Sequence, residues 1–232
     1  MPWSLLDSVT ENDALLELYG KDGMFMIRAN GLELMNGFCH DSETALGHLA
    51  AALAPSRAPR VLVGGLGLGY TVAALADALG ERGTIAVAEL SGAVIDWFHR
   101  HIEPSVVPKQ RRDPRIVHTD VADLLAAGER YDVIALDVDN GPEPLVTAGN
   151  AALYSPVGLR ALHSSLSEHG TALLWSGFQS TSFESSAREA GFAVACQRYR
   201  RPRADLSHFI YVLTKEFNAA TEKPKINHIV ME

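Results

Sequence analysis

The chain has 232 residues, of which 47% are hydrophobic and 21% charged, and its formal net charge is −8 at pH 7. This length and composition predict one folded domain, or one domain with a small appendage, and they exclude a disordered chain. The negative charge argues against nucleic-acid binding, which needs a basic surface. Two basic clusters, 109–115 and 198–203, are interpreted as exposed surface.

The sequence shows no pattern of metal, redox or membrane chemistry. Cys39 and Cys196 lie far apart and fit no metal or redox spacing, so we interpret both as buried thiols. The nine histidines show no ligand spacing, and no metal is expected. No apolar run is long enough to span a bilayer, and no signal peptide is evident. We therefore expect a soluble, cytoplasmic protein with no membrane partner.

Residues 1–55 are predicted to form a cap of short strands and a helix. Strands within 15–35 are expected to break at Gly20, Gly23 and Asn30-Gly31, and the last pair is a strong hairpin signal. Residues 42–53 have a helical pattern. We expect the cap to lie over the active face, and a packed amino-terminal extension is the alternative.

Apolar runs alternate with amphipathic segments after residue 60, which is typical of repeating βα units. Two strands without a helix between them end this pattern and predict an antiparallel edge to a mostly parallel sheet. We expect one Rossmann-like α/β domain over 56–214, and a tail at 215–232 that is disordered or docks on a partner subunit. The predicted strands are 60–64, 84–89, 115–119, 131–137, 171–176, 193–199 and 209–214, and the predicted helices are 70–79, 93–101, 121–126, 155–167 and 182–190.

The segment RVLVGGLGLGYT joins a buried strand to a helix through a glycine turn. Gly65, Gly67 and Gly69 follow the pattern G-x-G-x-G, which lets backbone approach a ligand and directs N–H groups toward it. The dinucleotide fingerprint would place its third glycine at position 70, where Tyr70 stands. An NAD-dependent oxidoreductase is therefore disfavoured.

An acidic residue ends each of the next two predicted strands. Glu89 lies twenty residues after Gly69, where a carboxylate can accept both hydrogens of a ribose diol. Capping of the helix that starts near Gly92 is the alternative for Glu89. Asp120 is placed to meet an adenine amino group or, alternatively, to cap the next helix.

The fourth predicted strand ends in Asp137 and Asp139, whose side chains share one side if the backbone is extended. Two carboxylates about 5 Å apart repel by about 3 kcal/mol at an effective dielectric of about 20, so a cationic amine suits this position. The amine must lose a proton before it attacks, and a carboxylate can assist. Alternatively, both acids cap a loop that turns through Gly141. His40, which precedes Asp41 and Glu43, is considered as an accessory base.

Taken together, these segments resemble the spermidine synthase-like branch of the class I methyltransferase superfamily over about residues 55–176. GGLGLG is similar to the family's GGGDGG, AVAEL to its acid-bearing second strand, TD to its adenine-contacting Asp, and YDVIALDVDNGP to its catalytic segment. The resemblance implies a class I methyltransferase fold and an adenosyl-sulfonium cofactor, S-adenosylmethionine or its decarboxylated form. It places Glu89 on the ribose, Asp120 on the adenine and Asp137 at the amine.

The chain also departs from the family at several positions. Leu68 stands where the family's Asp meets the amino group of decarboxylated S-adenosylmethionine, and Asn140 stands where a second acid would be. Val63 and Gly64 lack the acid that typical methyltransferases place before the glycine turn.

The changes at Leu68 and Asn140 favour methyl transfer from S-adenosylmethionine to an amine or similar nucleophile of a small molecule, whereas Val63 and Gly64 depart from typical methyltransferases. Aminopropyl transfer from the decarboxylated donor, which makes a polyamine, is the alternative. A non-catalytic module that binds S-adenosylmethionine is the second alternative. The family's habit of dimerising makes a homodimer a possible assembly.

Overall fold

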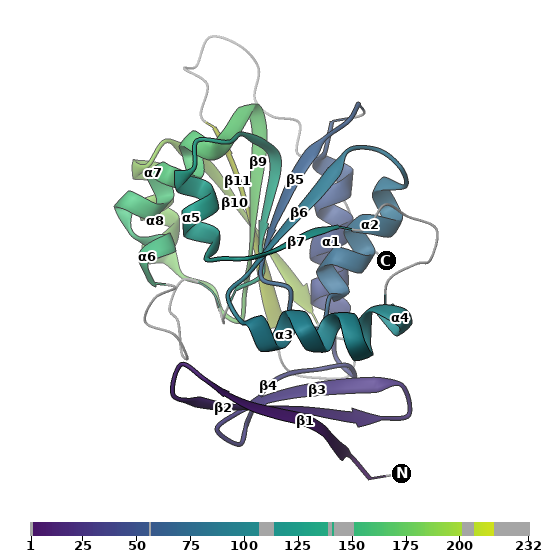
Figure 1. The fold of residues 1–232 in the computed structure, drawn as a ribbon. Coiled ribbons are helices and arrows are strands. Elements are labelled where there is room, and N and C mark those ends of the chain that lie inside the picture. The colour runs from purple at the N-terminus through teal and green to yellow at the C-terminus, as the bar shows by residue number, and fades with distance from the viewer. Residues whose placement is uncertain are drawn as a thin grey trace.

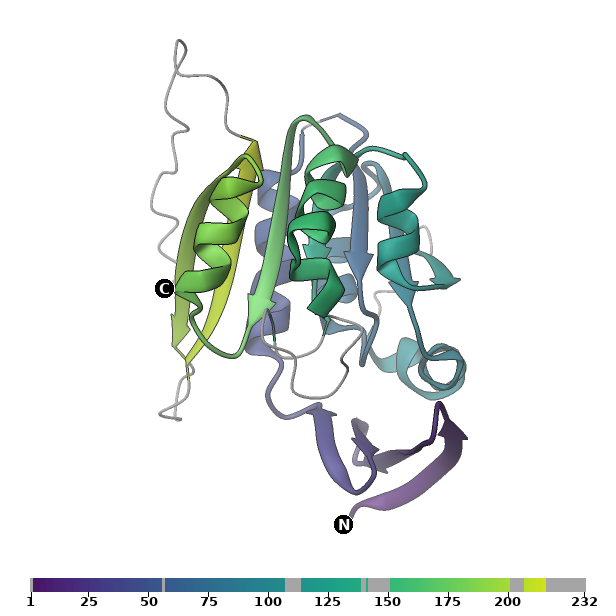
Figure 2. The ribbon, with the colours of Figure 1, turned by 90° about the vertical axis from the view of Figure 1, so that its left-hand side faces the viewer.

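The computed structural model describes residues 2–55, 57–106, 114–138, 141, 151–200 and 207–215. Within them the chain forms a four-stranded antiparallel sheet and a seven-stranded mixed sheet (Figure 1). Helices cover both faces of the larger sheet. The smaller sheet lies beyond the carboxyl ends of the parallel strands of the larger sheet (Figure 2). This is the predicted α/β architecture, with the amino-terminal strands on the side where such sheets bind ligands.

Two-residue turns connect the four strands of the amino-terminal sheet, with both turn residues at positive φ. The hairpin predicted at Asn30-Gly31 is confirmed, whereas the strand break predicted at Gly20 is wrong. A Cβ at Gly20 would lie 2.7 Å from Leu6 Cδ1, so the missing side chain makes room for Leu6 on the neighbouring strand. The strands are β1 (Ser4–Glu11), β2 (Ala14–Lys21), β3 (Met24–Ala29) and β4 (Leu32–Asn36), in that spatial order, and β1 was not predicted.

The larger sheet has the order β10-β11-β9-β8-β5-β6-β7. The five strands β5 to β9 pair in parallel with their neighbours, and β11 runs antiparallel to both β9 and β10, which confirms the predicted mostly parallel sheet with its antiparallel margin. The strands are β5 (Arg60–Gly64), β6 (Thr84–Glu89), β7 (Arg115–His118), β8 (Tyr131–Leu136), β9 (Leu166–Ser176), β10 (Phe192–Arg200) and β11 (Ser207–Lys215).

Two buried apolar clusters hold the helical layers on the sheet. The side chains of Ser91, Asp120, Ser155 and Ser180 each cap the amino end of the helix that follows them. One face carries α1 (Asp41–Leu53), α2 (Tyr70–Leu79), and α3 (Gly92–Trp97), which continues through a π-helical turn, η1 (Phe98–Ile102), into α4 (Glu103–Val106). The other face carries α5 (Val121–Ala126), α6 (Ala151–Tyr154), α7 (Pro156–Ser165) and α8 (Thr181–Glu189).

Helix α1 packs on α2 and against the larger sheet. The two helices approach closely at Gly47, where a Cβ would lie 2.4 Å from the backbone oxygen of Thr71. The first turn of α1 lies at the same end of the sheet as the glycine turn, because the Glu43 backbone oxygen is 3.2 Å from Thr71 Oγ1. The boundaries at 55 and 214 remain predictions.

Cys39, between β4 and α1, is exposed, so its interpretation as a buried thiol is wrong. Cys196 is partly buried, and burial raises the pKa of its thiol to about 11. No helix among the described residues is long and apolar enough to cross a membrane.

The amino-terminal sheet carries exposed apolar side chains, which include Leu5, Leu6, Leu32 and Leu34. The homodimer stays a prediction.

Candidate active site

The glycine turn follows β5 and leads directly into α2. Gly65, Gly67 and Gly69 all have positive φ, at 87°, 52° and 80°. A Cβ added at Gly65 would lie 2.3 Å from the backbone oxygen of Asp137, and one added at Gly69 would lie 2.4 Å from Phe98 Cε2. Glycine is therefore required here by both the backbone conformation and the close packing of neighbouring elements.

Glu89, at the end of β6, holds the glycine turn from one side. Its Oε2 accepts a hydrogen bond from the Leu66 N–H at 2.9 Å and a long one from the Gly67 N–H at 3.5 Å. Its Oε1 accepts from the Ser91 N–H at 2.8 Å. Because a carboxylate offers about four acceptor directions, these contacts leave capacity for a ribose hydroxyl. Ser91, not Glu89, caps α3 through its side chain.

Asp120 lies after β7, next to the end of β6, since the Thr119 N–H donates to the Glu89 backbone oxygen at 3.0 Å. Asp120 Oδ1 accepts from the Ala122 N–H at 2.9 Å and caps α5. The capping role is therefore present in the structure. The adenine contact stays a prediction, and it would use the other carboxylate oxygen.

Asp137 follows β8 and faces the glycine turn from the side opposite to Glu89. Its N–H donates to the Gly64 backbone oxygen at 2.8 Å, which extends the β5–β8 ladder by one residue. Its Oδ2 accepts a hydrogen bond from Thr71 Oγ1 at 2.6 Å. The order β8-β5-β6 thus puts Asp137 and Glu89 at the carboxyl ends of the two strands that flank the turn.

Burial, followed by the negative charge of Glu43, raises the pKa of Asp137 to about 7, whereas the hydrogen bond from Thr71 lowers it. Near neutral pH this carboxyl group therefore exists in both protonation states. A group with a pKa close to the working pH is suited to accept and release a proton. Asp139 and Asn140 lie outside the described residues, so the predicted pairing of Asp139 with Asp137 stays a prediction.

His40 stacks on Tyr70, with ring centroids 3.8 Å apart and planes at 8°. Its Nδ1 lies 3.1 Å from Thr44 Oγ1. His40 therefore lies beside the first residue of α2, and its role as an accessory base stays a prediction. Leu68 is 4% exposed and packs in the apolar core. This position supplies no carboxylate to a ligand.

Sequence reasoning missed Thr71 and considered Glu43 only as a neighbour of His40. The sequence did contain a signal for Thr71, because it is a polar residue at the start of the apolar helix segment VAALA. Thr71 is 3% exposed, and a buried hydroxyl needs a partner. The identity of that partner required the tertiary structure.

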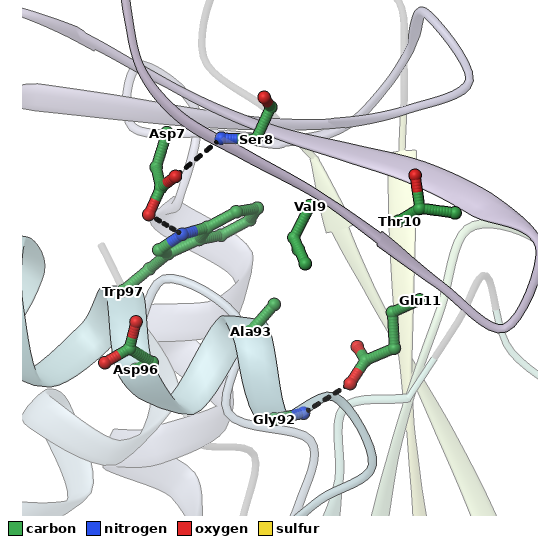
Figure 3. Close-up of a pocket in the computed structure, with 9 residues that line it drawn as sticks. All are labelled: Asp7, Ser8, Val9, Thr10, Glu11, Gly92, Ala93, Asp96 and Trp97. Atoms are coloured by element: carbon green, nitrogen blue, oxygen red, sulfur yellow. Dashed lines mark hydrogen bonds between the residues drawn. The ribbon is translucent and has the colours of Figure 1, made fainter.

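A cavity of about 360 Å³ lies between β1 and α3, and Asp137 is not among the residues that line it (Figure 3). Asp7 and Glu11 point toward α3 there, and they accept hydrogen bonds from Trp97 Nε1 at 3.0 Å and from the Gly92 N–H at 3.0 Å. These acids therefore fasten the amino-terminal sheet to the larger domain. No group of three His, Cys, Asp or Glu side chains in the described part of the chain could hold a metal ion.

Comparison with known proteins gives a fold but no sequence family. No family model matches the chain, and no curated protein matches it by sequence. A crystal structure of spermidine synthase in complex with the transition-state analogue AdoDATO superposes with a TM-score of 0.72 at 14% identity, covering 92% of this chain and 74% of the other. Spermidine synthase from Thermotoga maritima gives a TM-score of 0.68 at 14% identity, with 92% and 73% covered. The chain therefore has the fold of spermidine synthase, a class I methyltransferase fold, as its sequence motifs indicate.

Proposed function

We propose that this protein transfers a carbon group from an adenosyl-sulfonium donor to an amine, and that the group is the aminopropyl group of decarboxylated S-adenosylmethionine. The observation that carries the proposal is the placement of Asp137 and Glu89 at the carboxyl ends of the two strands beside the glycine turn. A donor laid across that turn would have its ribose at Glu89 and its sulfonium group toward Asp137. Likeness to spermidine synthase supports aminopropyl transfer over methyl transfer.

The bound donor supplies an activated carbon, because its sulfur is positively charged and leaves as a neutral thioether. The residues of this chain orient the amine and remove one proton. Ionised Asp137 attracts the amine as an ammonium ion and then accepts a proton from it, which frees the nitrogen lone pair to attack. The nitrogen–carbon bond forms as the carbon–sulfur bond breaks, and the bonding electrons stay on sulfur.

Methyl transfer from intact S-adenosylmethionine is the second candidate, and Leu68 is the observation that favours it. An apolar side chain at this position gives the ammonium group of the decarboxylated donor no charged partner. The two reactions release different nucleosides. Aminopropyl transfer leaves methylthioadenosine, whereas methyl transfer leaves S-adenosylhomocysteine.

Two measurements test the proposal. The first is calorimetry of the pure protein with each of the two donors, and the second is a product assay with a diamine. We expect tighter binding of the decarboxylated donor and release of methylthioadenosine. Release of S-adenosylhomocysteine would replace aminopropyl with methyl transfer. Donor binding without release of either thioether would support the non-catalytic module. Binding of neither donor would refute both the aminopropyl-transfer and the methyl-transfer hypotheses. Tight binding of NADH would instead restore the oxidoreductase alternative.

A further inference from the structure

A hydrogen-bond network from two other elements reaches the Asp137 side chain. The Thr71 hydroxyl, on the first turn of α2, lies 2.6 Å from Asp137 Oδ2 and 3.2 Å from the backbone oxygen of Glu43. A hydroxyl group has one hydrogen and can donate it to one of these two acceptors at a time. The close packing of α1 on α2 at Gly47 brings the Glu43 carbonyl within reach.

This geometry satisfies both protonation states of Asp137. When Asp137 is ionised, Thr71 donates its hydrogen to Oδ2. When the acid proton is on Oδ2, Asp137 can donate it to Thr71 Oγ1, and the Thr71 hydrogen turns to the Glu43 carbonyl. When the proton is on Oδ1, the original hydrogen bond remains. In none of these states does a heavy atom have to move, so the carboxyl group keeps its orientation.

The Glu43 carboxylate is fixed by a second chain of contacts. Ser42, which is 2% exposed, donates its hydroxyl hydrogen to Glu43 Oε2 at 2.5 Å. His208 Nδ1, on β11, lies 2.7 Å from the same Ser42 oxygen. Because the Ser42 hydrogen is already used, His208 Nδ1 carries the hydrogen of the second contact when Glu43 is ionised.

The charge of Glu43 reaches groups on three separate elements. It raises the pKa of Asp137 after β8, of Tyr70 on α2 and of Tyr199 on β10, in each case after the larger effect of burial. Asp41 contributes to the same upward pKa shift at Tyr199. The geometry agrees with these effects, because the backbone oxygen of Glu43 and Asp137 Oδ2 both contact the same Thr71 hydroxyl, at 3.2 Å and 2.6 Å. Glu43 therefore supplies a negative charge near Asp137.

We propose that Thr71 and Glu43 are positioning residues for Asp137: the Thr71 hydroxyl holds its carboxyl group in one orientation through proton uptake and release, and Glu43 keeps a second negative charge beside it. The inference rests on the proposed function in one respect, namely that Asp137 takes the proton of the amine. Glu43 would thereby supply, from α1, a second acid near the amine, while Asn140 stands where the family has one.

The test is a carbon-13 NMR titration of the protein alone, labelled at its aspartate carboxyl carbons, with the Asp137 signal assigned from Asp137→Asn. Thr71→Val removes the hydroxyl at nearly constant shape, and we expect it to raise the pKa of Asp137 by about 1 to 2, because the lost hydrogen bond favours the ionised form. Thr71→Ser should restore the wild-type pKa. Glu43→Gln should lower the pKa by about 1, because a like charge is removed.

Thr171→Val is the matched control, since Thr171 is a buried threonine on β9 at 6% exposure, and it should leave the pKa of Asp137 unchanged. An unchanged pKa in Thr71→Val, a Thr71→Ser variant that behaves like Thr71→Val, or a rise in Glu43→Gln would each overturn the inference. If Thr71→Val does not fold, Thr71→Ala removes the same hydroxyl and should raise the pKa of Asp137 in the same direction, and Glu43→Gln decides the part of the inference that concerns Glu43.

The titration needs neither donor nor acceptor, so a failure of the proposed transfer reaction leaves its result intact. In the active enzyme, Thr71→Val should also lower kcat and move the acidic limb of the pH profile to higher pH, while donor affinity is retained. A purely structural role for Thr71 would lower stability without moving that limb.

Discussion

Replacement of Asp137 by Asn should stabilise the protein at alkaline pH and not at acidic pH. The pKa of this carboxyl group is raised from 3.8 to about 7 in the folded chain. Between these two values the folded state holds a proton that the unfolded state has released. The free energy of unfolding of the wild type therefore falls as pH rises through this window, and the fall levels off above pH 7.

The magnitude follows from the same two pKa values. Integration of the pH dependence from pH 5 to pH 8 lowers the free energy of unfolding of the wild type by about 2 to 3 kcal/mol. Asp137→Asn cannot titrate at this position and does not show this decrease. For a chain of this length, that difference corresponds to a shift in Tm of about 4 to 12 °C. The Tm of the variant should therefore rise relative to that of the wild type as pH increases.

Urea unfolding followed by tryptophan fluorescence at pH 5, 6, 7 and 8 would measure the difference, because Trp97 is buried and Trp175 partly buried. Asp77→Asn, which changes an exposed aspartate on α2, serves as the control and should give a flat difference across this range. A stability difference between Asp137→Asn and wild type that stays constant from pH 5 to pH 8 would show that Asp137 does not titrate in this window.

Three further variants test other parts of the site. Glu89→Ala should weaken binding of S-adenosylhomocysteine by about 1.5 to 3 kcal/mol in calorimetry, the range for a hydrogen bond to a charged group, and an unchanged affinity would refute the ribose assignment. Asp120→Ser keeps a good cap for α5 but shortens the side chain, so thermal stability should be retained while donor affinity falls; equal affinity would leave Asp120 with the capping role alone. Gly47→Ala places a Cβ 2.4 Å from the Thr71 backbone oxygen and should destabilise the protein by about 1 to 3 kcal/mol in urea unfolding, and a neutral result would contradict the close approach of α1 and α2.

The amino-terminal sheet shows where sequence patterns failed. Strand β1 carries mostly exposed residues and lacks a clean alternation of apolar and polar side chains, so its sequence gives little periodic signal. Its position depends on pairing with β2 and on contacts such as Asp7 with Trp97, 90 residues away. Strand β9 likewise begins at Leu166, five residues before the prediction, because Leu166 pairs with Tyr131 on β8.

Local patterns in the sequence were sufficient for the βα alternation, the glycine turn and the acids that end β6 and β8. Each of these features is encoded within one strand and its following turn, and parallel strands bring their carboxyl ends to one edge of the sheet. Only the tertiary structure decided what surrounds Asp137. Thr71 lies 66 residues from Asp137, and His208 lies 166 residues from Ser42. No local pattern determines such pairs, because they depend on how α1, α2 and β11 pack against the sheet.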